Sequence, residues 1–414
     1  MFWFILGRES LLSAAEIAAV LNLPQTDIRI NIILEAEIPA GLSPALLITR
    51  LGGTVKIARL LGKNLSYDKL IETIVERLNH QSGKIEFGVS VYNSRDPKLS
   101  ESLGKAVKRI VKSTGKNARY VYNREPVLSS VTVAKNGLDK SDGEYIIFEN
   151  KTGSYDVAVT EAVQPFEEFS ERDFGRPGRD DVSGMLPPKL AMMMINLAQV
   201  KTNAVVFDPF CGSGTIITEA ALMGYTNLVG SDLSEKAISD TKKNIEWMRE
   251  RSHTNYHPDR HSDCHPDRHS ERSPKGGVEE SMVASPRLFQ ADATDFGGKI
   301  PARSIDAIIA EPYMGKPLSG RESETQLLDQ MDELKTLYLS AFKEFTKILK
   351  PKAIVVFIIP RFRTRNDWMV MGIKEDIKKL GFMPKPLSPG HDSLLYARST
   401  QRVGREVFRF IFSK

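Results

Sequence analysis

Residues 205–215 constrain the fold of this chain more than any other stretch. The first three are apolar and predict a buried strand that ends at Asp208. Gly212 and Gly214 predict a tight turn after this strand, and an apolar helical segment begins at Thr215. A glycine-rich turn between a strand and a helix is where doubly wound α/β sheets bind an adenosine-containing cofactor. The stretch therefore predicts a mostly parallel sheet with a cofactor site at one edge.

The charge of Asp208 indicates which cofactor this turn would bind. A dinucleotide site directs backbone N–H groups and a helix N-terminus at a pyrophosphate, and a carboxylate at the strand end would repel that anion. The third glycine of the dinucleotide fingerprint is also absent. S-adenosylmethionine has no phosphate and carries a sulfonium and an ammonium group, which a carboxylate attracts. The turn therefore favours S-adenosylmethionine over a nicotinamide dinucleotide, and a glycine turn without a ligand is the structural alternative.

Two further acids follow predicted strands of the same sheet. Asp232 ends the second strand, where an acid accepts hydrogen bonds from ribose hydroxyls in adenosine-cofactor folds. The alternative role for Asp232 is a helix N-cap, which Ser234 could also fill. Asp292 ends the third strand, and we expect it to face the adenine amine.

Length and composition limit the remaining possibilities. A chain of 414 residues is longer than one typical domain, and its 41% hydrophobic and 26% charged residues are typical of a globular protein. No apolar run reaches the length of a membrane span, so we expect no membrane partner. Two cysteines exclude a disulfide framework and favour a reducing cytoplasm.

The order of predicted elements divides the chain into four parts. Residues 1–62 alternate strands and helices in the order of a small α+β ferredoxin-like module. Residues 63–165 form a second unit, in which Ser130–Ala134 is expected to be a strand. Residues 166–184 are polar and predict a linker. Residues 185–414 alternate strands and helices and end in a strand pair, which predicts a mostly parallel sheet with one antiparallel edge.

A predicted helix over residues 98–114 carries a basic stripe opposite an apolar one. Such a stripe is an electrostatic footprint for a phosphate backbone, and an ordinary solvated face is the alternative. The basic residues that we expect to contact RNA lie on this helix or just before it: Arg95, Lys105, Lys108, Arg109 and Lys112.

An insert at residues 251–286 interrupts the C-terminal part. The hexamer His-Pro-Asp-Arg-His-Ser occurs in it twice, at 257–262 and 265–270. Histidine clusters can bind metal, but this insert lacks the apolar residues and the ligand spacing of a zinc module. We therefore expect a disordered surface loop and no metal site.

The fourth predicted strand is Ile305–Ala310, and Glu311, Pro312 and Tyr313 follow it. The carboxyl end of the strand beside the cofactor strand is where a doubly wound sheet places its substrate. An exocyclic base amine is a poor nucleophile, because its lone pair is delocalised into the ring. A side-chain acceptor and a backbone carbonyl on its two hydrogens would localise that pair, while an aromatic ring would stack on an extruded base. These three residues are the predicted catalytic group, and a simple strand-ending turn is the alternative.

Four motifs together resemble the class I methyltransferases of nucleic acids that carry an RNA-binding THUMP domain, and most closely the tRNA guanosine-10 N2-methyltransferases. The resemblance covers nearly all of the chain, and these motifs carry it: Leu6–Glu9, Arg172–Pro177, Gly184–Ala191 and Asp208–Thr215. The resemblance implies a Rossmann-like, seven-stranded sheet, a THUMP-like module at 63–165 and a tRNA substrate. It also implies that Asp208–Thr215, including Phe210, is the donor-binding motif.

The chain departs from this family in the catalytic loop. The family carries Asp-Pro-Pro-Tyr-Gly, and a gap-free match sets this motif against Glu311–Gly315. Glu311 then replaces the aspartate, Tyr313 the second proline and Met314 the aromatic residue. A shift by one residue would instead keep Tyr313 as the aromatic and place Glu311 on the first proline.

The function that the sequence favours is S-adenosylmethionine-dependent methylation of an exocyclic base amine in RNA, with guanine N2 of tRNA as the first candidate. Methylation of ribosomal RNA or of a DNA amine is a second possibility. A third is an RNA-binding relative that has lost catalysis and kept the donor pocket. The carboxylate of Asp208 argues against an NAD-dependent oxidoreductase.

Overall fold

The computed structural model describes residues 1–23, 28–29, 32–179, 184–255, 285–364 and 367–414. The chain forms two compact units, each built from more than one segment. The first unit comprises Met1–Phe174, Pro188–Gln199 and Lys385–Arg409. The second comprises Gly175–Pro187, Val200–Pro384 and Phe410–Lys414. Most of the insert expected at 251–286 lies outside the described residues.

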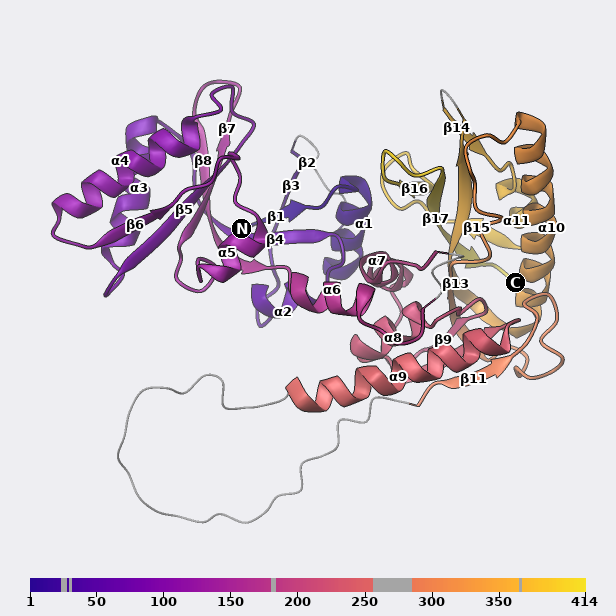
Figure 1. The fold of residues 1–414 in the computed structure, drawn as a ribbon. Coiled ribbons are helices and arrows are strands. Elements are labelled where there is room, and N and C mark those ends of the chain that lie inside the picture. Colours follow the sequence, from indigo (N-terminus) through magenta and orange to yellow (C-terminus); the bar gives the residue numbers. More distant parts are fainter. Residues whose placement is uncertain (24–27, 30–31, 180–183, 256–284, 365–366) are drawn as a thin grey trace, which may run out of the picture. The chain divides into compact units, whose positions relative to one another are not determined.

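An eight-stranded sheet in the order β2-β3-β1-β4-β8-β7-β5-β6 forms the frame of the first unit (Figure 1). Its strands are β1 (Phe2–Leu6), β2 (Ile28–Arg29), β3 (Ile33–Ala36), β4 (Thr54–Leu65), β5 (Ile85–Tyr92), β6 (Ala118–Val121), β7 (Glu144–Glu149) and β8 (Tyr155–Val163). The antiparallel pairing of β4 with β8 joins the two predicted N-terminal modules into one sheet. The predicted boundary at residue 62 falls within β4.

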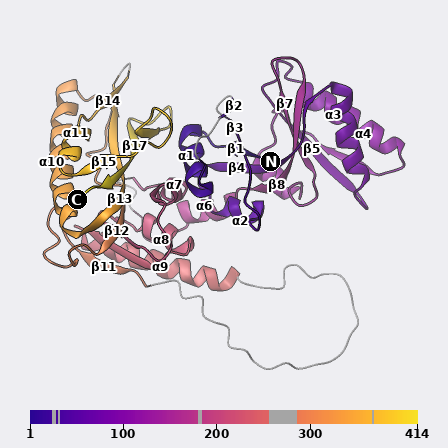
Figure 2. The same cartoon turned by 180° about the vertical axis from the view of Figure 1, so that it is seen from behind.

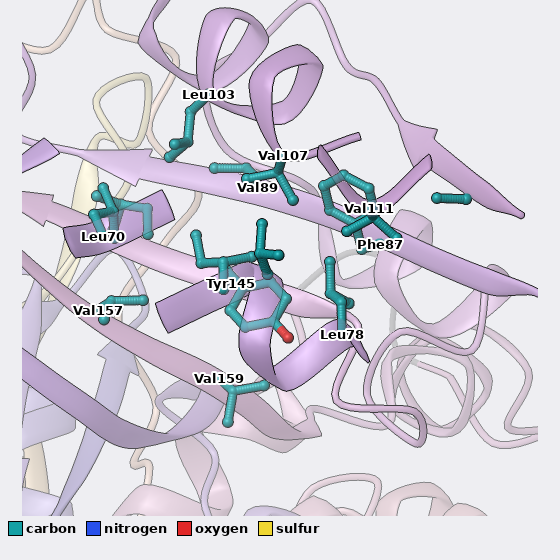
Figure 3. Packing of buried hydrophobic residues seen from close by; sticks show 14 of the residues in the cluster. Leu70, Leu78, Phe87, Val89, Leu103, Val107, Val111, Tyr145, Val157 and Val159 are labelled. Carbon is teal, nitrogen blue, oxygen red and sulfur yellow. The ribbon is translucent and has the colours of Figure 1, made fainter. Parts of the chain in front are cut away.

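The helices of the first unit are α1 (Ser10–Leu21), α2 (Pro44–Thr49), α3 (Tyr67–Asn79), α4 (Leu99–Ser113), α5 (Ser130–Lys135), α6 (Phe166–Phe174) and α7 (Pro188–Ala198). Figure 3 shows apolar side chains of α3 and α4 interleaved with those of β5, β7 and β8. Leu103, Val107 and Val111 supply the buried side of α4. This packing fixes which side of α4 faces solvent.

The strand expected at Ser130–Ala134 is wrong, because these residues form helix α5. Its β-branched residues favour a strand by local propensity. Ser129 instead caps the helix, since its Oγ accepts a hydrogen bond from the N–H of Thr132 at 3.1 Å. Val133 is fully buried on the helix. The polar segment predicted as a linker also contains a helix, α6.

Strands β9–β15 form the frame of the second unit and belong to a nine-stranded sheet with the main order β11-β10-β9-β12-β13-β17-β15. β16 and residues 403–409 of β17 fall in the segment Lys385–Arg409. The strands are β9 (Val205–Asp208), β10 (Asn227–Asp232), β11 (Arg287–Gln290), β12 (Ile305–Ala310), β13 (Leu349–Arg363), β14 (Trp368–Val370), β15 (Phe382–Pro384), β16 (Ser393–Tyr396) and β17 (Val403–Phe412). β9–β13 pair in parallel, and β15 pairs antiparallel with the last residues of β17. The mostly parallel sheet with an antiparallel edge is thus confirmed.

Helices cover both faces of this sheet. They are α8 (Thr215–Leu222), α9 (Glu235–Asn255), α10 (Glu324–Ile348) and α11 (Lys374–Lys379). Figures 1 and 2 show α8 and α9 on one face, with α10 and α11 on the other. The described part of the chain contains no helix with the length and apolar character that a membrane crossing needs.

A buried ionic network ties the strands of the first unit together. Lys56 of β4 and Glu144 of β7 form an ion pair with side chains 1% and 0% exposed. The Glu144 carboxylate also accepts hydrogen bonds from Ser90 and Thr160, at 2.5 and 2.6 Å. Lys56 Nζ donates a second hydrogen bond to the carbonyl of Leu128 at 2.7 Å. Both charges are fully buried. A buried ion pair stabilises a fold only while each charge keeps its partners.

Replacing Lys56 with methionine is therefore expected to destabilise the chain strongly. The change leaves the buried Glu144 carboxylate without its cation, which typically costs about 3–5 kcal/mol. Urea denaturation followed by circular dichroism measures the shift in midpoint. Lys69→Met is the matched control, because Lys69 and Glu72 form an exposed pair, and a control shift as large as that of Lys56→Met would contradict the account.

Candidate active site

The turn after β9 carries a buried carboxylate. Asp208 is 1% exposed, and its Oδ1 accepts a hydrogen bond from the N–H of Phe210 at 3.1 Å. Gly212 and Gly214 have φ angles of +53° and +83°, a region that L side chains rarely adopt. The backbone can therefore turn sharply into α8, which begins at Thr215.

Three side chains from β10 and α9 hold this turn in place. Asp232 Oδ2 accepts a hydrogen bond from the N–H of Gly212 at 2.9 Å. Thr241 Oγ1 donates to the carbonyl of Gly212, and Asn244 Nδ2 donates to that of Ser213, each at 2.8 Å. The sequence analysis missed Thr241 and Asn244. Each side chain forms a hydrogen bond to a backbone group far away in the sequence, so no pattern of neighbouring residues indicates its role.

A close contact with α9 also requires glycine at position 214. A Cβ atom at this position would lie 2.6 Å from Thr241 Cγ2, well inside contact distance. Thr241 is fully buried on α9, so it has little room to move. Because Gly214 has no side chain, the turn can pack directly against α9.

Burial and two neighbouring acids make the ionised form of Asp208 unfavourable. Burial raises the pKa of Asp208 well above its ordinary value, although the Phe210 N–H acts in the opposite direction. The carboxylates of Asp232 and Glu311 raise this pKa further. Asp232 at the end of β10 and Glu311 after β12 are thus each close enough to repel the Asp208 carboxylate. A cationic ligand between them would relieve this repulsion.

The predicted catalytic residues follow β12 directly. Glu311 is half-buried, Pro312 is buried, and the Tyr313 side chain is 51% exposed. The hydroxyl of Tyr338 on α10 donates a hydrogen bond to the carbonyl of Tyr313 at 2.6 Å. Burial, followed by the charge of Glu311, raises the pKa of Tyr338, so the hydroxyl keeps its proton. Tyr338 anchors the loop, a role that the sequence analysis did not predict.

The other two predicted donor acids already accept local hydrogen bonds. Asp232 Oδ1 accepts from the N–H of Ser234 at 2.9 Å, and Ser234 Oγ in turn caps α9. Asp292 is exposed after β11, and its Oδ1 accepts from the N–H and hydroxyl of Thr294. A carboxylate oxygen can accept more than one hydrogen bond. The ribose role of Asp232 and the adenine role of Asp292 stay predictions.

Arg176 contacts the first residue of α8 and was not among the predicted donor-binding residues. Arg176 is 5% exposed, and its Nη1 donates a hydrogen bond to Thr215 Oγ1. Phe210, also predicted in the donor motif, packs edge-on against Phe357 with ring centroids 6.3 Å apart. The motif Arg172–Pro177 therefore reaches the donor turn through Arg176.

The predicted RNA-binding residues belong to the first unit, whereas the donor turn belongs to the second. Arg95, Lys105, Arg109 and Lys112 are exposed, and Lys108 is half-buried. Lys105 forms an exposed ion pair with Glu101. Lys108, Arg109 and Lys112 lie on α4 away from its fully buried residues, whereas Arg95 precedes the helix.

The sheet order and the turn after β9 define a Rossmann-like methyltransferase domain. A family model described as "RMKL-like, methyltransferase domain" matches residues 176–376, and one described as "DNA methylase" matches residues 98–243. The crystal structure of TrmN from Thermus thermophilus superposes with a TM-score of 0.53 over 100% of both chains, at 17% identity. At this identity the likeness supports the fold alone.

Curated relatives then identify the family. The tRNA (guanine(10)-N2)-dimethyltransferase of Methanocaldococcus jannaschii is 46% identical over 151 residues, which are 36% of this chain and 35% of the relative. A protein of Methanothermococcus thermolithotrophicus named "Probable tRNA (guanine(10)-N2)-dimethyltransferase" is 40% identical over 146 residues, 35% of this chain and 72% of the relative. The chain belongs to the family of the tRNA (guanine(10)-N2)-dimethyltransferases. The match spans only about a third of the M. jannaschii protein.

Gly214→Ala is expected to reduce binding of S-adenosylmethionine at least tenfold, because the new methyl group displaces Thr241 and strains the turn. Gly224→Ala is the matched control. Gly224 also has a positive φ, +88°, but a Cβ there meets nothing within 4 Å. The control should lose about 1 kcal/mol of stability and keep its affinity. Isothermal calorimetry measures both affinities, and equal losses would contradict the account.

Donor binding is expected to depend on pH through Asp208. The pKa of Asp208 is raised in the free protein. A fraction of the molecules therefore carries a protonated Asp208 at pH values at which an ordinary aspartate is ionised. A cation binds the ionised form, so affinity should increase with pH, by at most about tenfold per unit, and binding should release a proton. Calorimetry from pH 5 to 7, in buffers of different ionisation enthalpy, measures both effects. Asp208→Asn should abolish them, and an unchanged pH dependence in this variant would exclude Asp208 as the cause.

Proposed function

We propose that this chain transfers a methyl group from S-adenosylmethionine to the N2 amine of a guanine in tRNA. The observation that carries the proposal is the proximity of Asp208 and Glu311, which interact electrostatically at the ends of the neighbouring strands β9 and β12. One acid lies at the donor turn and the other at the substrate position of the same sheet edge. Guanine 10 is the target that the names of the relatives suggest.

The residues around the turn suit S-adenosylmethionine. When bound, the donor supplies a methyl group on a sulfonium, from which an amine lone pair can displace a neutral thioether. Asp208 would attract the cationic part of the donor. Burial and the neighbouring acids disfavour its ionised form, and a bound cation would stabilise that form. Asp232 would accept a hydrogen bond from the ribose, and Asp292 would face the adenine. The open backbone at Gly212 and Gly214 would allow close approach.

The loop after β12 would orient the target amine. Glu311 accepts a hydrogen bond from one amine hydrogen and can take up the proton that the amine loses after transfer. The carbonyl of Pro312 accepts the other hydrogen, since the next carbonyl, that of Tyr313, is already bonded to Tyr338. The exposed Tyr313 ring would stack on the extruded base. Catalysis then depends on alignment of the amine with the methyl group.

The first unit would bind the tRNA backbone. Lys108, Arg109 and Lys112 place positive charge along α4, and Arg95 adds a further cation before this helix. Phosphates bind to this kind of surface. The assignment of residues 63–165 as a THUMP-like module is part of this proposal.

Glu311→Ala is expected to lower kcat by about 10²- to 10⁴-fold, because the amine loses its acceptor, while tRNA affinity stays within roughly twofold. Glu324→Ala, an exposed glutamate at the start of α10, is the control and should keep full activity. Mass spectrometry of nucleosides from treated tRNA transcripts detects N2-methylguanosine and N2,N2-dimethylguanosine. Full activity of Glu311→Ala, or no N2-methylated guanosine from any tRNA, would contradict the proposal.

A second candidate is methylation of an amine in DNA. The match of residues 98–243 to the "DNA methylase" model favours it, because this match includes the donor turn. Duplex DNA in the same assay separates the two candidates: methyl transfer to DNA and not to tRNA would favour the second.

A further inference from the structure

A small pocket lies beside the catalytic loop, between this loop and α10. Its volume is about 180 Å³, which is enough for one nucleobase, and its wall includes Tyr313, Gly315, Lys316, Gln330, Glu333 and Leu337. All of these residues belong to the second unit. Glu311 and Pro312 are not part of the wall. The pocket can therefore hold a base other than the one whose amine would react at Glu311.

The chemistry of the wall suits a nucleotide. The exposed ring of Tyr313 offers an aromatic surface, and base–aromatic stacking contributes about 1–3 kcal/mol per base. Lys316 and Glu333 are both exposed, and among the described residues neither forms an ion pair. An ammonium group can bind a phosphate, and a carboxylate accepts hydrogen bonds only.

Gln330 holds the pocket wall in shape. Its Oε1 accepts a hydrogen bond from the N–H of Lys316 at 3.2 Å. Gly315 has a φ of +91°, and a Cβ there would lie 2.6 Å from Gln330 Nε2. The loop therefore lies directly against the Gln330 amide, which connects the pocket rigidly to the catalytic loop.

We propose that this pocket binds the nucleotide next to the target guanine and selects it by its base. This inference rests on the proposed function. Tyr313 stacks on the neighbouring base with one ring face and on the target base with the other. Glu333 accepts hydrogen bonds from the edge of the neighbouring base, and Lys316 contacts the phosphate. Guanine fits best, because its adjacent N1–H and N2–H groups match the two oxygens of a carboxylate.

The test uses the full chain and tRNA transcripts with a guanine at position 10. The nucleotides on either side are changed one at a time, with a compensating change wherever the changed nucleotide is paired in a stem. Filter binding without donor measures affinity, and nucleoside mass spectrometry with donor measures methylation. The unchanged chain should prefer guanine on one side on the order of tenfold. Glu333→Gln should reduce this preference to about twofold or less, whereas Glu324→Gln should retain it.

A second variant tests the phosphate contact. Lys316→Ala should weaken the binding of all transcripts to the same extent. It should also reduce the slope of log affinity against log salt concentration by about one. No preference for a neighbouring base in the unchanged chain, or the same preference in Glu333→Gln, would overturn the inference. If transcripts are N2-methylated without such a preference, the pocket assignment fails and the proposed function stands. If the preference depends on Glu333 and no transcript is methylated, the pocket assignment stands and the proposed function fails.

Discussion

The buried carboxylate of Asp208 is the constraint on which the second unit depends. An acid that is 1% exposed and close to two other acids costs free energy in the isolated protein, because burial and the neighbouring negative charges both disfavour its ionised form. Such an arrangement is useful only where a cation binds. The same carboxylate that excludes a pyrophosphate would attract a sulfonium or an ammonium group. The charge of one residue therefore separates this glycine turn from those that bind dinucleotides.

The surrounding elements hold that carboxylate and its partners at fixed positions. Parallel pairing aligns Asp208 with Gly230 of β10 and brings the ends of β9, β10 and β12 to one edge. Thr241 and Asn244 fix the carbonyls of the turn, while Tyr338 fixes that of the catalytic loop. α9 and α10 lie on opposite faces of the sheet (Figure 2). Each face thus contributes one anchoring helix to the site, one for the donor turn and one for the substrate loop.

Much of this could be predicted from local sequence, because strands that end in acids and turns that need glycine leave a pattern in consecutive residues. The predicted strand Ile305–Ala310 agrees with β12 at both ends. Helix α5 was predicted as a strand, and its β-branched residues do favour a strand by local propensity, but Ser129 caps it as a helix in the structure. Tyr338 and Asn244 could not be found in this way. Each acts on a backbone group far along the chain, so its role exists only once the tertiary structure has formed.

The account makes one central claim: a carboxylate at the end of β9 selects a cationic adenosine compound and rejects a phosphate-bearing one. Calorimetric titration of the unmodified chain with S-adenosylmethionine and, separately, with nicotinamide adenine dinucleotide measures this selection directly. The account predicts saturable one-to-one binding of S-adenosylmethionine and no detectable heat of binding for the dinucleotide. Tight binding of the dinucleotide, together with no binding of S-adenosylmethionine, would contradict it.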